Sequence, residues 1–121
     1  MAQTIMVVDD SNAIRQSVSF ILKENGYETI EACDGRDGYD KLKDRKVDLI
    51  ITDVNMPNMD GISMVRELRE TDTHKFTPIL VLTTESQASI MQDGKSAGAT
   101  GWIVKPFSND KLIATIKKVL G

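Results

Sequence analysis

Short, unbroken apolar runs recur along the chain and alternate with longer segments of mixed polarity. Three runs have strand length and no polar interruption, at residues 5–8, 49–51 and 79–82. Continuous hydrophobicity is typical of strands that are buried on both faces, as in a parallel sheet covered by helices. Two further candidates, residues 27–32 and 101–104, are more polar or shorter, which is typical of edge strands. The pattern predicts a sheet with these two strands at its margins.

The longer segments carry apolar residues three and four positions apart, which is the spacing of one helix face. Such faces are formed by Ile14, Val18, Ile21 and Leu22, by Ile62, Val65 and Leu68, and by Leu112, Ile113, Ile116, Val119 and Leu120. Ser11, Asp60 and Ser108 precede these faces, where a side-chain oxygen can cap the first helical turn. Residues 35–45 and 86–96 contain glycines that lower helix propensity, and they are the remaining expected helices.

Strands and helices therefore alternate strictly, five of each. This order predicts a parallel sheet with right-handed crossovers and helices on both faces, an α/β fold. Ligands of open parallel sheets bind at the carboxyl ends of the strands, where the strand order reverses. Candidate chemistry is therefore expected in the residues that directly follow each strand.

Composition narrows the class of protein. The chain has 121 residues, 15 basic and 18 acidic side chains and a net charge of −3, which does not favour nucleic-acid binding. A single cysteine, Cys33, excludes an internal disulfide. No apolar stretch approaches the roughly 20 residues of a membrane span, and the first residues do not resemble a signal peptide. We expect one soluble, cytoplasmic domain.

Five polar residues directly follow predicted strands. Asp9 and Asp10 follow the first strand, Asp53 the third, Thr83 the fourth and Lys105 the fifth. Each alone has an ordinary explanation, because aspartates form turns and lysines are usually solvated. If the sheet is built as predicted, however, all five converge on one rim, and this convergence favours a functional site.

Three neighbouring carboxylates repel one another, and a hard divalent cation removes this conflict. Mg²⁺ suits such a site because it binds one or two carboxylates while keeping waters and accepting phosphate oxygens. Phosphoryl transfer requires mainly positioning and charge neutralisation, and an aspartate can serve as the nucleophile. The cluster with Lys105 and Thr83 therefore predicts phosphoryl transfer onto a carboxylate.

Four motifs carry a family resemblance, at residues 8–11 (VDDS), 52–61 (TDVNMPNMDG), 82–85 (LTTE) and 104–107 (VKPF). Together they resemble the receiver domain of bacterial two-component response regulators. The similarity extends over almost the whole chain, so residues 1–121 are expected to form one receiver domain of the single-domain chemotaxis type. The resemblance implies a doubly wound, flavodoxin-like fold with strand order 2-1-3-4-5.

The resemblance also implies the roles of the acidic residues. Asp53 corresponds to the phosphoacceptor. Asp10 and Asp53, together with the backbone carbonyl of Asn55, correspond to the direct ligands of Mg²⁺ or another divalent cation such as Mn²⁺, and Asp9 to a ligand acting through water. No other cofactor is expected.

The remaining motif residues correspond to switch and tuning positions. Thr83 resembles the hydroxyl that moves to a phosphoryl oxygen, and Lys105 the lysine that contacts another, with a cis peptide bond before Pro106. Asn55 and Glu85 occupy positions that set the rate of phosphoryl hydrolysis, and polar side chains there indicate a short-lived phosphoryl group. Trp102 stands where most receivers carry Tyr or Phe as a rotamer-switching aromatic. Fixed packing of the bulkier indole is the alternative.

The resemblance implies a signalling switch whose only reactions are self-phosphorylation from phosphohistidine and autodephosphorylation. The expected phosphodonor is a histidine kinase of the chemotaxis (CheA-like) type, and the expected target is a flagellar motor switch protein or another protein. The alternative is a phosphorelay intermediate that passes phosphate to a histidine phosphotransfer protein. Neither nucleic acid nor membrane is an expected partner.

Two other classes share parts of the pattern. Magnesium-dependent phosphotransferases with an Asp nucleophile place it after the first strand as Asp-x-Asp, whereas here Asp9 and Asp10 are adjacent. A flavodoxin-like electron carrier needs a phosphate loop rich in Ser, Thr and Gly after the first strand, and the two aspartates would repel the FMN phosphate. His74 lies in a polar loop without a second ligand for a metal ion, so neither it nor the lone Cys33 is expected to have a functional role.

Overall fold

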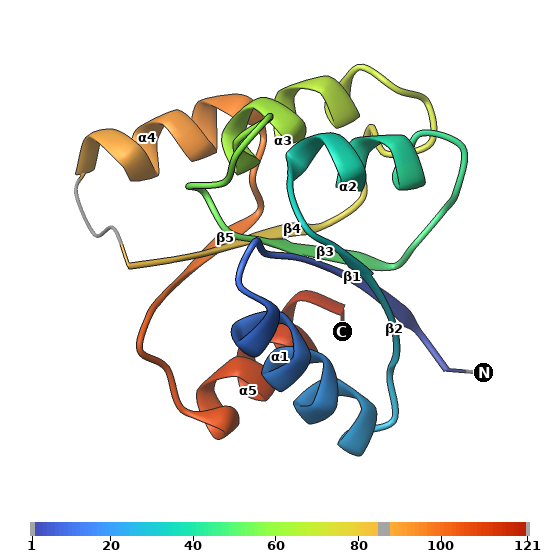
Figure 1. Cartoon of the computed structure of the whole chain (residues 1–121), viewed down its shortest axis with the longest axis vertical. Helices are drawn as coiled ribbons and strands as arrows, with labels where there is room; N and C mark the ends of the chain where they lie inside the picture. Colours follow the sequence, from blue (N-terminus) through green and yellow to red (C-terminus); the bar gives the residue numbers. More distant parts are fainter. Residues whose placement is uncertain (1, 85–87, 121) are drawn as a thin grey trace.

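The computed structural model describes residues 2–84 and 88–120, in which strands and helices alternate (Figure 1). The strands are β1 (Thr4–Val8), β2 (Glu28–Ala32), β3 (Leu49–Thr52), β4 (Ile79–Thr83) and β5 (Gly101–Val104). The helices are α1 (Asn12–Glu24), α2 (Gly35–Leu42), α3 (Gly61–Arg69), α4 (Ala88–Ala97) and α5 (Asn109–Leu120). Of the helices in these ranges, none has the length and apolarity that a membrane crossing requires.

The five strands form one parallel sheet in the order β2-β1-β3-β4-β5. This confirms the fold class and the placement of the two more polar strands at the edges. Helices α1 and α5 cover one face of the sheet, and α2, α3 and α4 cover the other (Figure 1). The strand order reverses next to β1, so the carboxyl ends of β1 and β3 open beside the crevice where such folds bind ligands.

Successive strand residues point to opposite faces and fill two separate cores. In β1, Ile5 and Val7 belong to the cluster under α1 and α5, while Met6 and Val8 belong to the cluster under the other three helices. Because both faces are covered, every position from Ile5 to Val8 is buried. The unbroken apolar runs of the sequence have this cause.

Side chains cap the helices where the sequence predicts them. Ser11 Oγ accepts a hydrogen bond from the Ile14 N–H, and Asp60 Oδ1 accepts one from the Ser63 N–H at 2.8 Å. Ser108 Oγ likewise accepts from the backbone N–H three residues on. Each cap satisfies a donor that the first helical turn leaves unpaired. These caps fix where the chain leaves the carboxyl edge of the sheet and enters each helix.

His74 lies in the loop before β4, as expected, and is fully buried there. Its Nδ1 lies 3.0 Å from Thr77 Oγ1, and its Nε2 lies 2.7 Å from the Leu42 carbonyl and 2.8 Å from the Arg45 carbonyl. The imidazole ring therefore lies within hydrogen-bond distance of two carbonyls at and just beyond the end of α2. This helix ends at Leu42 rather than at the expected residue 45. The partners of His74 are mostly backbone atoms of a distant segment, which polarity along the sequence does not reveal.

Candidate functional site

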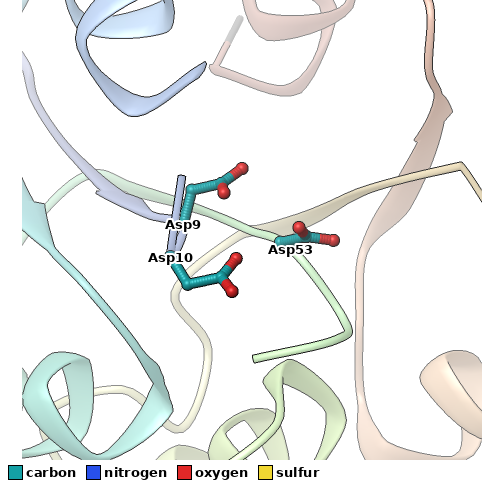
Figure 2. A group of neighbouring side chains, drawn as sticks. All are labelled: Asp9, Asp10 and Asp53. Atoms are coloured by element: carbon teal, nitrogen blue, oxygen red, sulfur yellow. The ribbon is translucent and has the colours of Figure 1, made fainter. Parts of the chain in front are cut away.

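Three carboxylates meet at the carboxyl edge of the sheet. Asp9 and Asp10 follow β1, and Asp53 follows β3, the adjacent strand. Figure 2 shows the side chains of Asp9 and Asp10 extending toward the strand end that carries Asp53. One oxygen from each of the three carboxylates lies within 4.8 Å of the others. The parallel register of β1 and β3 therefore brings together residues that are 43 positions apart in the sequence.

Lys105 places a positive charge between two of these carboxylates. Its Nζ lies 3.3 Å from Asp9 Oδ2 and 3.4 Å from Asp53 Oδ2. Its backbone N–H donates to the Thr83 carbonyl at 2.7 Å, and the bond to Pro106 is cis, as expected. The lysine side chain is only 12% exposed, so its charge is little screened by solvent. Lys105 therefore pairs with two of the three carboxylates.

Backbone N–H groups orient two of the carboxylates. Asp9 Oδ1 accepts from the Ser11 N–H at 2.9 Å, and Asp53 Oδ1 accepts from the Val54 N–H at 2.7 Å. In each pair the other oxygen, Oδ2, is the one that faces Lys105. The two side chains are therefore held with one oxygen bound to the backbone and one directed to the cluster.

A glycine positions the loop that follows Asp53. The Gly61 N–H donates to the Val54 carbonyl at 2.9 Å, and a Cβ atom at Gly61 would lie 1.9 Å from the Asp53 carbonyl oxygen. No larger residue fits without moving the backbone of Asp53. Sequence reasoning assigned Gly61 no role, although it directly follows the predicted cap Asp60.

The surroundings shift the pKa of Asp53. Burial is the largest cause and raises the pKa of this carboxyl group above its usual range. The Lys105 ammonium and the Val54 N–H act in the opposite direction and lower it, while the charge of Asp9 raises it further. Without additional positive charge, the cluster therefore disfavours the ionised form of Asp53.

The donor set suits a hard divalent cation. Mg²⁺ and Mn²⁺ prefer carboxylate, carbonyl and water oxygens, and Asp9, Asp10 and Asp53 supply carboxylate oxygens at one point. Asp9 is buried, Asp53 half-buried and Asp10 exposed, so the cluster opens to solvent on one side. Asn55 lies exposed on the loop after Asp53.

The other predicted residues lie on the neighbouring strands. Thr83 is fully buried at the end of β4. Trp102 on β5 pairs with Val81, two residues before Thr83. Side chains two apart on a strand share a face, so Thr83 and Trp102 lie on the same face of the sheet. Glu85 lies outside the residues that the structure describes.

Comparisons with known proteins agree with this architecture. The model of the response regulator receiver domain family matches residues 5–117. The chain is 36% identical to the chemotaxis protein CheY of Bacillus subtilis over 121 residues, which cover 99% of each protein. It is 38% identical to the response regulator MprA of Mycolicibacterium vanbaalenii over 120 residues, but spans only 51% of that longer protein.

Solved structures show the same similarity in three dimensions. The chemotaxis protein CheY4 of Vibrio cholerae superposes with a TM-score of 0.94 at 46% identity, covering 98% of this chain and 99% of that one. The receiver domain of the sensor histidine kinase PA1611 from Pseudomonas aeruginosa superposes with a TM-score of 0.93 at 25% identity, over 100% of this chain and 99% of that one. That structure holds a magnesium ion in its active-site cleft.

Receiver domains of this kind are signalling switches rather than metabolic enzymes, and they imply a histidine kinase as phosphodonor and a target protein. The family match over most of the sequence, the strand order and the acidic cluster agree: this chain belongs to the response regulator receiver domain family.

Proposed function

We propose that the chain is a single-domain response regulator that takes a phosphoryl group from a phosphohistidine onto Asp53 and then presents an altered face to a target protein. The observation that carries this proposal is the meeting of three carboxylates within 4.8 Å next to the largely covered side chain of Lys105. Structural ion pairs balance their charges, whereas this cluster leaves an excess of negative charge that favours a bound cation, and that cation would in turn attract a phosphoryl group.

The transfer step follows from the geometry around Asp53. One of its carboxylate oxygens attacks the phosphorus atom, the new P–O bond forms, and the P–N bond to the donor imidazole breaks. The leaving nitrogen keeps the electron pair and takes up a proton. Lys105 Nζ, 3.4 Å from Asp53 Oδ2, stabilises the charge on the transferred group, and the Val54 N–H, 2.7 Å from Oδ1, holds the nucleophile in position.

A divalent cation belongs to this mechanism. Asp10, Asp53 and the Asn55 carbonyl would bind it directly, and Asp9 through water. When bound, Mg²⁺ or Mn²⁺ supplies the positive charge that offsets the carboxylates and the phosphoryl oxygens. Asn55 and Glu85 then set how fast water removes the phosphoryl group in autodephosphorylation.

Phosphorylation changes the charge next to Thr83. We propose that the Thr83 hydroxyl moves toward the phosphoryl group and leaves space on the face that it shares with Trp102. The region of α4 and β5 then shifts between two arrangements, one of which binds the target. Couplings of this kind are typically about 1–3 kcal/mol, so activation should tighten target binding by roughly 5–150-fold.

Chemotaxis is the favoured pathway. The chain covers nearly the full length of the chemotaxis proteins CheY and CheY4, but only about half of MprA. We propose a CheA-like histidine kinase as donor and a flagellar motor switch protein as target, in the cytoplasm. Purified motor switch protein should bind the beryllofluoride-activated chain. Transfer of the phosphoryl group to a histidine phosphotransfer protein without motor binding would instead identify a relay intermediate.

The phosphoacceptor is tested with a small-molecule phosphodonor. Incubation with acetyl phosphate and Mg²⁺ should add one phosphoryl group to the protein, detected by intact mass, and Asp53→Asn should abolish the addition because the amide is not a nucleophile for this reaction. Asp40→Asn, an equal charge change on the exposed face of α2, is the control and should react normally. Full phosphorylation of Asp53→Asn would refute the assignment.

A further inference from the structure

Trp102 packs against α4 across an edge strand. It lies on β5, the last strand of the sheet, and its side chain joins the core cluster under α2, α3 and α4. The neighbouring residue Ile103 points to the opposite core. Trp102 therefore fills the space between the edge of the sheet and α4.

The point of contact on α4 is a glycine. Gly94 lies inside α4, is buried, and has no side chain between its backbone and the indole ring. A Cβ atom at Gly94 would lie 2.5 Å from Trp102 Cζ3 and 3.3 Å from Cη2. The first distance is shorter than carbon atoms tolerate. Even alanine at Gly94 therefore excludes the indole from its present position.

The presence of a glycine at position 94 does not stabilise the helix. Glycine in a helix interior is less favourable than alanine, and Gly94 lies within a helix of 10 residues. Among the side chains of α4 that the structure describes, the buried positions are Gly94 and Ala97. Between Met91 and Ala97 this helix thus buries only very small residues, and Trp102 fills the space that they leave.

Packing alone holds the indole in this position. Its Nε1 is buried and has no hydrogen-bond partner within the part of the chain that the structure describes. An unpaired buried N–H favours any arrangement in which it meets water or an acceptor. The ring is thus held by its fit over Gly94 and by no polar contact found there.

Space for a displaced ring lies directly beside it. A hollow of about 220 Å³ is lined by Met91, Lys95, Ala99, Thr100, Gly101 and Trp102. The indole borders this hollow on one side and Gly94 on the other. The ring occupies the position over the glycine, and the hollow is the direction in which an indole displaced from Gly94 would move.

We propose that Gly94 is the positioning residue for Trp102. In the unphosphorylated protein, the absence of a side chain at Gly94 leaves the space that the indole occupies, which we call its seat; this is the steric half of the proposal. The regulatory half is that Gly94 also sets how readily the ring leaves this seat. This second half rests on the proposed function, in which movement of Thr83 frees space on the same face. The steric half concerns the unphosphorylated protein and stands independently of phosphorylation.

Trp102 is the single tryptophan of the chain, so tryptophan fluorescence reports on this seat alone. Without phosphodonor or metal, Gly94→Ala should shift the emission to longer wavelength and raise quenching by acrylamide, since overpacking of this kind moves the equilibrium by about tenfold or more. Ser96→Ala, an exposed change on the same helix, is the control and should leave both unchanged. Unaltered emission and quenching in Gly94→Ala would overturn the proposal.

A second pair of variants keeps the test clear of simple misfolding. In a Trp102→Phe background, Gly94→Ala should raise the urea midpoint measured by circular dichroism, because the shorter ring leaves room and alanine favours the helix. In the unaltered background, the same substitution should lower it. Equal destabilisation in both backgrounds would overturn the assignment of the indole as the group that Gly94 accommodates.

Activation with beryllofluoride and Mg²⁺ tests the regulatory half of the proposal separately from the steric half. The unaltered protein should change its fluorescence on activation, and Gly94→Ala should show a smaller change because its ring has already left the seat. If phosphorylation occurs normally but the fluorescence of the unaltered protein does not respond, the regulatory half is overturned while the proposed function stands. Failure of Asp53 to accept phosphate would instead count against the proposed function and the regulatory half that rests on it, and would leave the steric half standing.

Discussion

The two edges of the sheet use charged groups in opposite ways. At the carboxyl edge, Asp9, Asp10 and Asp53 crowd together with Lys105 as the neighbouring cation. At the amino edge, where the loops enter the strands, His74 and Thr77 are buried polar groups that have hydrogen-bond partners. The same sheet therefore holds one cluster in electrostatic conflict and one in balance.

Arg69 shows how the amino edge is balanced. Its guanidinium donates to the Gly98 carbonyl from Nε at 3.1 Å and from Nη2 at 2.8 Å. Its Nη1 donates to the carbonyls of His74 at 2.8 Å and Thr77 at 2.6 Å. One side chain thus joins α3 to the loop before β4 and to the loop before β5.

This difference indicates a structural role for the amino edge and a functional role for the carboxyl edge. Satisfied buried polar groups hold a fold rigidly, so the amino edge stabilises the loops that enter the strands. Unbalanced charge is typical of functional sites, and at the carboxyl edge a divalent cation would supply the positive charge that the three carboxylates lack. Substitutions at the two edges should consequently have opposite effects on stability and activity.

The largest effect on stability is expected from Arg69→Met. The substitution leaves the carbonyls of Gly98, His74 and Thr77 without their donor, and lost charge-assisted hydrogen bonds of this kind should lower the free energy of unfolding by about 2–3 kcal/mol. Urea denaturation measures the change. The rate of phosphorylation by acetyl phosphate should stay within about twofold, because no reacting group has moved.

Arg66→Met is the matched control for this experiment. Arg66 lies exposed on the same helix and carries the same charge, so its loss should change stability by less than about 0.5 kcal/mol. Equal effects of the two substitutions would mean that the amino edge is stabilised by helix charge rather than by the contacts of Arg69.

The two edges also differ in what the sequence reveals. The carboxyl edge was predictable because strands are apolar runs and because Asp9, Asp53 and Lys105 directly follow them. The amino edge was not, since the main partners of His74 and Arg69 are backbone carbonyls from segments up to 32 residues away. A carbonyl is present at every residue, so no pattern marks the few that a buried side chain selects.

Close contacts that are possible only because a glycine has no side chain could not be predicted from the sequence either. The sequence pattern assigns Gly61 no role, and it marks Gly94 as a residue that weakens its helix, because glycine lowers helix propensity. Their function emerges only when the Asp53 backbone and the Trp102 ring are seen against them. The helices themselves, with the caps Ser11 and Asp60, were predictable because capping is local.

The contribution of His74 to the free energy of unfolding is expected to depend on pH and to be intermediate in size. Burial is the largest cause that lowers the pKa of this ring, with the charges of Lys46 and Arg69 adding to it, while hydrogen bonds to the Leu42 and Arg45 carbonyls act in the opposite direction. The unfolded chain therefore binds a proton near pH 6.5 that the folded protein refuses. Stability conferred by the neutral ring is complete above that pH and is lost as the pH falls below it, by at most about 1.4 kcal/mol per pH unit.

The comparison of the unaltered protein with His74→Gln isolates this contribution. Asp53, whose raised pKa acts with the opposite sign, is present in both proteins and cancels. The difference between their urea midpoints should therefore shrink from pH 7.5 to pH 5. Parallel curves would show that folding does not lower the pKa of His74 and that the amino edge tolerates acid as well as the rest of the protein.

The smallest effect is expected from Asp10→Asn, and it has the opposite sign to that of Arg69→Met. Removing one of three crowded charges from the exposed side of the cluster should raise the free energy of unfolding by about 0.5–1 kcal/mol in the absence of metal. Mg²⁺ should stabilise the unaltered protein in proportion to its binding and stabilise Asp10→Asn much less, as thermal denaturation with and without the ion will show.

Asp72→Asn tests whether the stability gained in Asp10→Asn depends on the position of the removed charge or only on the net charge of the protein. Asp72 is exposed in the loop before β4, at the amino edge, so its neutralisation changes the net charge equally without touching the carboxylate cluster. A gain from Asp10→Asn that Asp72→Asn does not share locates the conflict at the carboxyl edge. Equal gains would attribute the effect to the overall negative charge, and the contrast between the two edges would then not extend to their energetics.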